Sequence, residues 1–225
     1  MLRRVEYGEA DLVLTLLTRE LGKVSALARG ARKSQKRFGG ALEPMHTLAV
    51  ALDERPGAEL FSLVEAKLQV PRAQLLASLS ALEAAGKALS WVRRAAPPRT
   101  PEREPYAALS ALLDRLDQAP DGESVSLALP EAGLALLCAF GWGIDFERCV
   151  RCGRQALATQ SASVDPARGG LVCRSCGGAR LRLSADARGR MARAAQGESF
   201  VLTSADASAA LGLVEAALGA HAGIE

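Results

Sequence analysis

Short runs of alternating apolar and polar residues fill the first seventy positions, a pattern typical of β-strands with one buried face. Pro56-Gly57 separates the last two runs and marks a turn. Four or five short strands in this length favour a small barrel or sandwich, because a lone sheet of this size would bury too little apolar area. The predicted strands cover residues 12–18, 23–31, 48–53 and 58–70.

The period becomes helical at Pro71. Residues 71–94 are rich in Ala and Leu at helical spacing, and proline suits the first position of a helix. Four prolines within residues 96–105 predict a linker, since proline removes helical hydrogen bonds. Further helices are predicted over residues 106–117, 130–142, 184–195 and 204–220. The second of these four is apolar on nearly every face, so we expect it to be the central core helix, with Cys138 as a small core residue.

Composition places the chain among ordinary globular proteins. Of its 225 residues, 49% are apolar and 24% are charged, which excludes extensive disorder. No apolar run approaches the ~20 residues that span a bilayer, and the N-terminus lacks the apolar stretch of a signal peptide. We therefore expect a cytoplasmic protein, in which thiols stay reduced and clustered cysteines more often bind metal than form disulfides.

Four of the five cysteines form two C-x2-C pairs separated by twenty residues. Two such pairs supply the tetrahedral set of sulfur ligands that zinc prefers, and the glycine after each pair permits a tight turn. Four ligands leave no open position for water, so we expect one structural Zn²⁺ rather than a catalytic one. A redox dithiol pair or free buried thiols are the alternatives. The predicted metal ligands are Cys149, Cys152, Cys173 and Cys176.

The net charge of +3 conceals a strong segregation of charge. Residues 1–37 hold nine Lys/Arg against four acids, a local +5, and residues 38–146 are a local −5. Residues 147–193 hold ten arginines against three acids, a local +7. Two basic segments on either side of an acidic one suggest a polyanion contacted at more than one place. Solvated surface charge is the alternative for each cluster, and some of the arginines near the cysteines would offset the negative zinc–thiolate group.

The first basic segment ends in the run RGARKSQKR, which carries five cations and no acid. Its glycine and serine make it flexible, which suits contact with phosphates along an irregular strand. Nothing in it suggests reading of base edges, so binding should be largely independent of sequence. A solvated charge run or a localisation signal are the alternatives, and nearby Tyr7 and Phe38 either stack on bases or belong to the core or rim. The five cations are Arg29, Arg32, Lys33, Lys36 and Arg37.

No catalytic constellation is visible in the sequence. His46 and His221 lie far apart and outside any nucleophile or metal motif, and there is no phosphate-binding loop of the nucleotide hydrolases. Glu9 and Asp11 form a close acidic pair, which at the start of a strand is typical of exposed charge. We therefore expect a protein that is not an enzyme and has no nucleotide substrate.

Two segments resemble a known family. Residues 7–44, YGEADLVLTLLTRELGKVSALARGARKSQKRFGGALEP, resemble the N-terminal signature of the bacterial DNA repair protein RecO family. Residues 140–177, which contain FGWGIDFERCVRCG and GGLVCRSCG, resemble the zinc region of that family. The chain begins almost at its first strand, several residues earlier than is usual in this family. We therefore expect a shortened first strand or a misassigned start.

The resemblance implies an α+β fold in four parts. An N-terminal OB-fold β-barrel over residues 1–70 is expected to bind nucleic acid, and an α-helical domain begins over residues 71–146. Residues 147–180 would form a four-cysteine zinc ribbon or knuckle. Residues 181–225 would add C-terminal helices that pack with the helical domain.

The resemblance also implies a function. RecO proteins are bacterial, cytoplasmic, nucleoid-associated mediators of DNA repair and homologous recombination in the RecF pathway, without chemical catalysis. They bind single- and double-stranded DNA and anneal complementary strands. With RecR they load RecA on strands coated by the single-stranded DNA-binding protein SSB, whose acidic C-terminal tail is a further partner.

Three hypotheses follow from the residues and the resemblance. In the first, the chain is a DNA-binding mediator whose five loop cations contact phosphates, supported by Arg4 and Lys23 near the same barrel end. In the second, it is a DNA-processing enzyme, such as a nuclease or glycosylase, with an accessory zinc ribbon. In the third, it is a zinc-ribbon scaffold whose basic faces bind acidic proteins. We favour the first.

Overall fold

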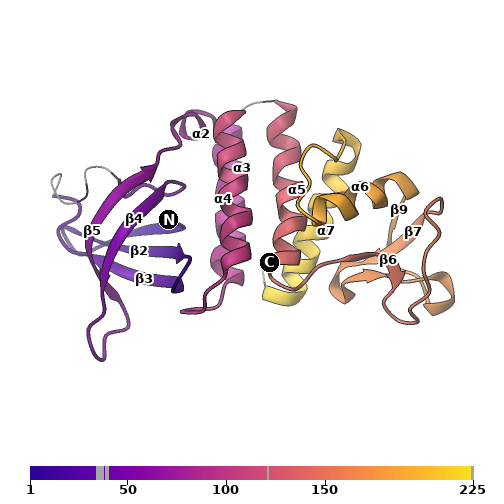
Figure 1. The fold of residues 1–225 in the computed structure, drawn as a ribbon, viewed down its shortest axis with the longest axis horizontal. Coiled ribbons are helices and arrows are strands. Elements are labelled where there is room, and N and C mark those ends of the chain that lie inside the picture. The colour runs from indigo at the N-terminus through magenta and orange to yellow at the C-terminus, as the bar shows by residue number, and fades with distance from the viewer. Residues whose placement is uncertain (34–37, 39–40, 121, 224–225) are drawn as a thin grey trace.

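The computed structural model describes residues 1–33, 38, 41–120 and 122–223. A five-stranded sheet lies at one end of the molecule, helices form the middle, and a smaller sheet lies at the other end (Figure 1). The α+β class predicted from the sequence is confirmed. Among the described helices, none combines the length and the apolar character needed to cross a membrane.

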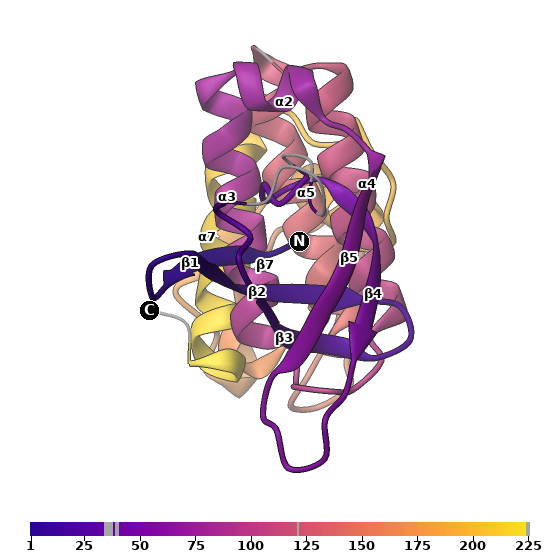
Figure 2. The ribbon, with the colours of Figure 1, turned by 90° about the vertical axis from the view of Figure 1, so that its left-hand side faces the viewer.

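The N-terminal sheet has the strand order β1-β2-β3-β5-β4. Neighbouring strands are antiparallel except β3 and β5, which run parallel and meet at two residue pairs. The sheet curls so that β4 and β5 cross β2 and β3 steeply (Figure 2). Five strands in a partly open barrel are consistent with an OB-fold, although no pair of described residues joins β4 to β1. The strands are β1 (Arg3–Tyr7), β2 (Asp11–Thr18), β3 (Gly22–Ala28), β4 (Thr47–Asp53) and β5 (Phe61–Val70).

Alternation along the strands builds the barrel core. Leu12, Leu14 and Leu16 of β2 are buried, while the residues between them are partly exposed. Their partners on β3 include the small residues Ala26 and Ala28, which leave room for larger side chains from other strands. Strand β1 does not belong to the runs predicted from the sequence, because all five of its residues are exposed and it carries no apolar alternation.

The predicted helix over residues 71–94 is two helices. These are α2 (Ala73–Ala77) and α3 (Leu79–Ala95), and Ser78 between them is extended. The Ser78 hydroxyl accepts a hydrogen bond from the N–H of Ala81 at 3.3 Å and donates to the carbonyl of Pro120 at 2.6 Å. Helical spacing of apolar residues continues through this position. The break between the two helices therefore depends on the capping hydroxyl and on a distant carbonyl, neither of which the apolar pattern reveals.

Two further helices differ from prediction at their ends. Helix α4 (Arg103–Gln118) begins before the predicted Tyr106, with Pro105 in its first turn. Helix α5 (Glu123–Ala139) begins seven residues before Pro130, which lies inside it. The first turns of α5 contribute buried Val125 and Leu127, so packing outweighs the cost of an internal proline.

The expectation for Cys138 is wrong, because its side chain is exposed on the last turn of α5. When a helix sequence is apolar on nearly every face, it does not reveal which face is exposed to solvent.

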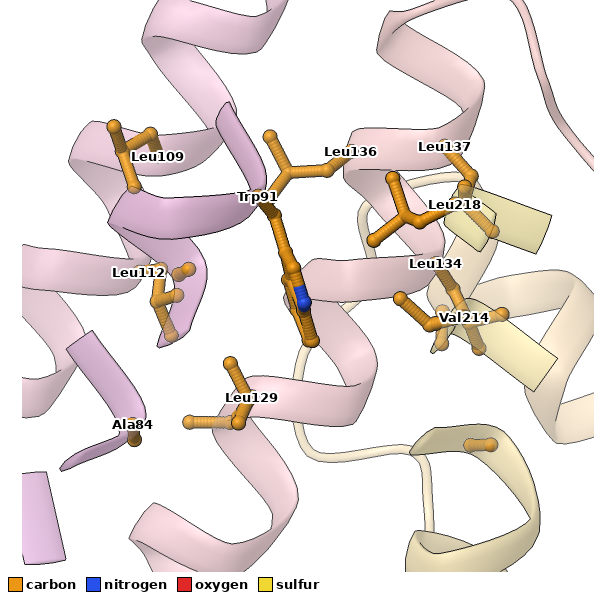
Figure 3. Packing of buried hydrophobic residues seen from close by; sticks show 14 of the residues in the cluster. Ala84, Trp91, Leu109, Leu112, Leu129, Leu134, Leu136, Leu137, Val214 and Leu218 are labelled. Atoms are coloured by element: carbon orange, nitrogen blue, oxygen red, sulfur yellow. The ribbon is translucent and has the colours of Figure 1, made fainter. Parts of the chain in front are cut away.

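The main core lies between the helices. Trp91 of α3 points into it among leucines of α4 and α5 and the side chains of Val214 and Leu218 on α7 (Ser204–Ala222; Figure 3). At Gly133 an added Cβ would lie 2.9 Å from a methyl of Val214, so only glycine permits this approach of α5 to α7. Helices α6 (Ala185–Ala195) and α7 (Ser204–Ala222) complete the layer.

The second sheet carries the cysteines and has the order β6-β8-β7-β9. We call residues 145–183 the cysteine module. Arg188 of α6, only 5% exposed, donates to the carbonyls of Phe146 and Leu157 at 3.1 and 2.6 Å and thereby fixes the module to the helices. Its strands are β6 (Asp145–Cys149), β7 (Ala162–Asp165), β8 (Gly170–Leu171) and β9 (Leu181–Leu183).

A polar junction joins the N-terminal sheet to the helices. Arg72, 2% exposed, donates to the carbonyl of Met45 at 2.6 Å and to the carboxylate of Asp114 at 2.6 and 3.0 Å. The proline-rich linker lies against β3, where the N–H of Arg99 donates to the carbonyl of Lys23. At Gly22, with φ of +66°, an added Cβ would lie 1.7 Å from the carbonyl oxygen of Thr100. The linker is thus docked tightly on the sheet.

Candidate metal centre and nucleic-acid interface

The four predicted ligand cysteines come together in the structure. Their sulfur atoms all lie within 4.8 Å of one another, and the Sγ atoms of Cys152 and Cys173 are 3.7 Å apart. Ligands 2.3 Å from a tetrahedral zinc ion lie about 3.8 Å from each other, so the cluster has the right size for one ion. The donor set and its dimensions therefore fit a metal ion held by four thiolates.

Backbone turns aim the sulfur atoms at one point. After the first pair, Gly153 has φ of +72° and its N–H donates to the carbonyl of Cys149 at 2.8 Å. After the second pair, the N–H of Gly178 donates to the carbonyl of Cys173 at 3.1 Å. The N–H of Cys173 donates to the sulfur of Cys149 at 3.4 Å, which joins the two turns.

The cluster favours loss of thiol protons at its buried corner. Donation from the N–H of Cys173 lowers the pKa of Cys149 to about 6. In contrast, hydrogen bonding to Cys173 and the other sulfur atoms raises the pKa of Cys176 to about 12. Four thiolates cannot share this space without a cation, because like charges at these distances repel strongly.

The basic loop follows β3 and is anchored by a residue whose role the sequence does not reveal. Asp11 accepts a hydrogen bond from the N–H of Gly30 at 2.7 Å, and Gly30 has φ of +66°. The N–H of Arg32 donates to the carbonyl of Ala10 at 3.0 Å. Asp11 is therefore a structural carboxylate that fixes the base of the loop rather than merely exposed charge.

Exposed cations lie along the described part of this loop. Arg29, Arg32 and Lys33 are exposed, and Arg32 forms an ion pair with Glu6 at 3.1 Å. Arg4 lies two residues from Glu6 on the same face of β1, so the structure brings Arg4 and Arg32 together. Arg4 is itself paired with Glu43 at 2.5 Å. The predicted contacts Lys36 and Arg37 lie outside the described residues.

Lys23 does not lie where its place in the sequence predicts. It stands at the beginning of β3 and Arg29 follows the end of that strand, about 20 Å away at ~3.3 Å per residue. Its ammonium donates to the carbonyl of Arg93 at 2.8 Å, and burial followed by the charge of Arg93 lowers its pKa. The expectation that Lys23 shares a barrel end with the loop is wrong, because the few residues that separate Lys23 from the loop form a whole strand and place the two at opposite ends of it.

The two aromatic residues near the loop have different environments. Phe38 is 2% exposed and belongs to the barrel core, whereas Tyr7 is 60% exposed at the end of β1. Of these two, Tyr7 is therefore the one accessible for stacking. Arg55, which no sequence pattern singles out, lies in the loop between β4 and β5 and lines a hollow of about 380 Å³ together with Arg29. Their separation in sequence hides this proximity.

The histidines take structural positions. His46 is 9% exposed, and its Nδ1 accepts from the N–H of Arg72 at 3.1 Å. Burial, and then the charge of Arg72, lowers the pKa of His46. The ring of His221 stacks on Trp142 with centroids 5.7 Å apart. Each histidine thus has a structural role, His46 through a hydrogen bond and His221 through ring stacking.

Comparison with known proteins agrees with these features. Residues 1–72 match the family described as "Recombination protein O N terminal", and residues 76–225 match "Recombination protein O C terminal". Proteins named "DNA repair protein RecO" are similar over most of the chain. The one from Anaeromyxobacter sp. (strain Fw109-5) is 38% identical over 180 residues, covering 78% of this chain and 68% of the relative. The one from Myxococcus xanthus (strain DK1622) is 36% identical over 177 residues, covering 79% and 70%. The chain therefore belongs to the recombination protein O (RecO) family of DNA repair proteins.

Proposed function

We propose that this chain is a non-catalytic mediator of recombinational repair that binds single- and double-stranded DNA without sequence preference and anneals complementary strands. The observation that carries the proposal is a loop of exposed cations, Arg29, Arg32 and Lys33, on the N-terminal sheet of a RecO-family chain. Exposed cations on a small barrel suit the phosphate backbone and carry no means of reading bases. Tyr7 and Arg55 extend this surface.

The proposed contacts are the five loop cations together with Arg4. We assign Lys23 to the junction between the sheet and the helices, since its ammonium is engaged there. Asp11 keeps the first part of the loop in a fixed conformation through Gly30. The cations beyond it would then follow the strand, with RecR and the acidic tail of SSB as protein partners and RecA as the protein that is loaded.

A salt titration tests the DNA-binding part of the proposal. Each phosphate contact with single strands contributes about −0.7 to the slope of log affinity against log salt. The variant Arg29→Ala/Arg32→Ala/Lys33→Ala should therefore lower the magnitude of the slope by about 2 and weaken binding. A control variant, Lys87→Ala/Arg103→Ala/Arg193→Ala, loses the same charge at surface sites on the helices and should leave the slope nearly unchanged. An equal effect of both variants would contradict the assignment of the loop.

Annealing tests the mediator role. With RecR present, the wild-type chain should anneal complementary strands coated with SSB, and the loop variant should do so more slowly. Incubation of labelled DNA with the chain, with and without Mg²⁺, should yield no cleaved strand and no excised base. Either product would overturn the non-catalytic assignment.

We further propose that the four cysteines hold one structural Zn²⁺. Zinc would close the loop between the two knuckles and fill its coordination sphere with protein ligands. Purified protein should contain about one zinc per chain, and Cys173→Ser should lose it. Chelation should remove hydrogen-exchange protection from residues 145–183 while β2 and β3 keep theirs. Protection that is unchanged after complete removal of metal would contradict a structural role.

A further inference from the structure

Two adjoining hollows open on the surface of the cysteine module, each with a volume of about 500 Å³. Ser163, Arg174 and Arg182 line both hollows. The first also contains Arg154 and the ligand cysteines Cys149 and Cys173, and the second contains Arg180, so four arginines line the two hollows beside the metal cluster. Neutral polar side chains form much of the remaining lining of the first hollow, namely Gln155, Gln160 and Ser161.

These arginines differ from others nearby in having no acidic partner among the residues that the structure describes. Arg168 and Arg193 form ion pairs with Asp165 and Glu198. Across the described parts of the chain, no ion pair involves the four arginines of the hollows. Arg182 donates to the neutral hydroxyl of Ser161 at 2.6 and 3.0 Å, which holds its guanidinium in place without neutralising it. The hollows therefore present uncompensated positive charge.

The metal centre does not consume this charge. A zinc ion with four thiolates carries about −2, against a local +7 for residues 147–193. The arginine that reaches across the cluster is Arg151, which donates to the carbonyl of Cys176 at 2.7 Å and takes no part in the hollows. A surplus of positive charge therefore remains on residues 147–193 with the ion bound, and it would attract a polyanion.

The chemistry of the hollows favours phosphates over an acidic peptide. The planar fork of arginine matches phosphate oxygens in pairs, and serine and glutamine add neutral donors. The second hollow offers Ala179 and two glycines but no large apolar side chain in which a peptide could anchor. A sugar–phosphate backbone needs no such anchor.

The position of the hollows separates them from the basic loop. The cysteine module and the N-terminal sheet lie at opposite ends of the long axis, with the helices between them (Figure 1). Residues 71–146, which supply most of that middle, hold seven Lys/Arg against nine acids, a local −2, and so offer no net positive charge to a strand laid along them. One strand is thus poorly suited to contact both basic ends at once.

We infer that the arginine-lined hollows of the cysteine module are a second nucleic-acid site, which binds the phosphate backbone of a strand other than the one held by the basic loop. The inference rests on the proposed function and extends it: one chain would hold two strands at once, as annealing requires. The N-terminal sheet supplies the first site and Arg154, Arg174, Arg180 and Arg182 the second.

A bridging assay tests this inference with the full-length chain. Donor- and acceptor-labelled single strands of unrelated sequence, mixed with equimolar protein, report two strands on one molecule by energy transfer. The variant Arg154→Gln/Arg174→Gln/Arg180→Gln should keep its affinity for one strand within about twofold, because the loop remains, and should lose at least about 80% of the energy transfer. The control variant Lys87→Gln/Arg168→Gln/Arg193→Gln removes the same charge from ion-paired positions and should bridge like the wild type.

Further measurements keep the outcomes distinct. Zinc content near one per chain shows that a variant retains its folded cysteine module. The single variant Arg180→Glu, three positions beyond Gly177, repeats the bridging assay with a change that is not next to a ligand cysteine. The loop variant should still bind one strand, with a reduced salt slope, through the module. Normal bridging by the variant Arg154→Gln/Arg174→Gln/Arg180→Gln would overturn the inference. So would DNA that stays bound to the loop variant when salt is added, because binding through the module should depend on salt. Tight binding of polyglutamate in place of DNA would assign the hollows to an acidic protein, and failure of the wild type to bind any DNA would overturn the proposed function itself.

Discussion

Replacing Glu131 with glutamine should strongly destabilise the helical core. This carboxylate of α5 is 3% exposed and receives four hydrogen bonds. Arg115 of α4 donates at 2.5 Å, and the backbone N–H groups of residues 200–202 donate at 2.8–3.0 Å. Through one side chain, α4 and α5 are thereby joined to the segment that leads into α7.

The magnitude follows from what glutamine would leave behind. Its amide oxygen could still accept from Val201 and Leu202, but its NH₂ would face two donors, Arg115 and the N–H of Phe200. Removing one partner of a buried ion pair costs about 3–5 kcal/mol, because the other charge stays buried without compensation. For a chain of this size, that corresponds to a fall in Tm of about 6–20 °C.

Thermal and urea denaturation of Glu131→Gln measure this loss directly. Glu215→Gln is the matched control, since Glu215 is paired with Lys87 at the exposed surface and should cost at most about 1 kcal/mol. Circular dichroism at about 222 nm reports the helices, and the slope against urea should be the same in both variants. A loss within about 1 kcal/mol of the control for Glu131→Gln would refute the idea that this carboxylate organises the core.

The same carboxylate predicts a pH dependence. Burial opposes its ionisation, but donation from Arg115 and from the N–H groups of residues 200–202 outweighs burial and holds the pKa of Glu131 below its ordinary value. A group whose pKa is lowered by folding stabilises the folded state above its unfolded pKa. That stabilisation is lost as pH falls through the folded value. Wild-type stability should therefore fall below about pH 4.5, and Glu131→Gln should weaken this dependence.

Three further predictions concern other parts of the chain. Gly22→Ala should lower stability by more than about 1 kcal/mol in urea denaturation, because φ is +66° and the new Cβ would overlap Thr100, whereas Gly57→Ala has a similar φ but open space. Asp206→Asn should remove the acid-labile part of stability between about pH 4 and 2, since hydrogen bonding from Arg190 lowers the pKa of Asp206 to about 2; equal acid titrations would contradict this. Tyr7→Ala should weaken single-strand binding by about 1–3 kcal/mol in a fluorescence titration, whereas Tyr7→Phe should keep it.

Elements with a regular period are predictable from this sequence. The period of two reveals β2 and β3, and the period of 3.6 reveals α6, because each of these elements buries one face. Strand β1 has no such signal, since every residue is exposed. The break at Ser78 depends on a carbonyl 42 residues away, which local periodicity cannot contain.

The candidate site divides in the same way. The cysteine spacing predicts the metal cluster because a knuckle is local, so its geometry depends on few residues between ligands. The loop cations are equally local. Lys23 and Asp11 required the three-dimensional structure, because their partners, Arg93 and Gly30, are brought to them by the docking of α3 on the sheet and by the turn after β3. Arg55 and Arg29 line one hollow because the last residues of β3 pair with the first residues of β5.

The side-by-side helices of the middle layer also set the effective concentration at which ligands bound at the two ends of the molecule meet each other. Helix α4 packs on α5, and α5 packs on α7, with about 8–10 Å between the axes of each pair. The N-terminal sheet and the cysteine module are therefore held apart by a stiff spacer of a few nanometres rather than by a flexible tether. Two ligands bound at its ends would experience each other at a concentration on the order of millimolar, whatever their concentration in solution. An encounter between two dilute strands would become an intramolecular search.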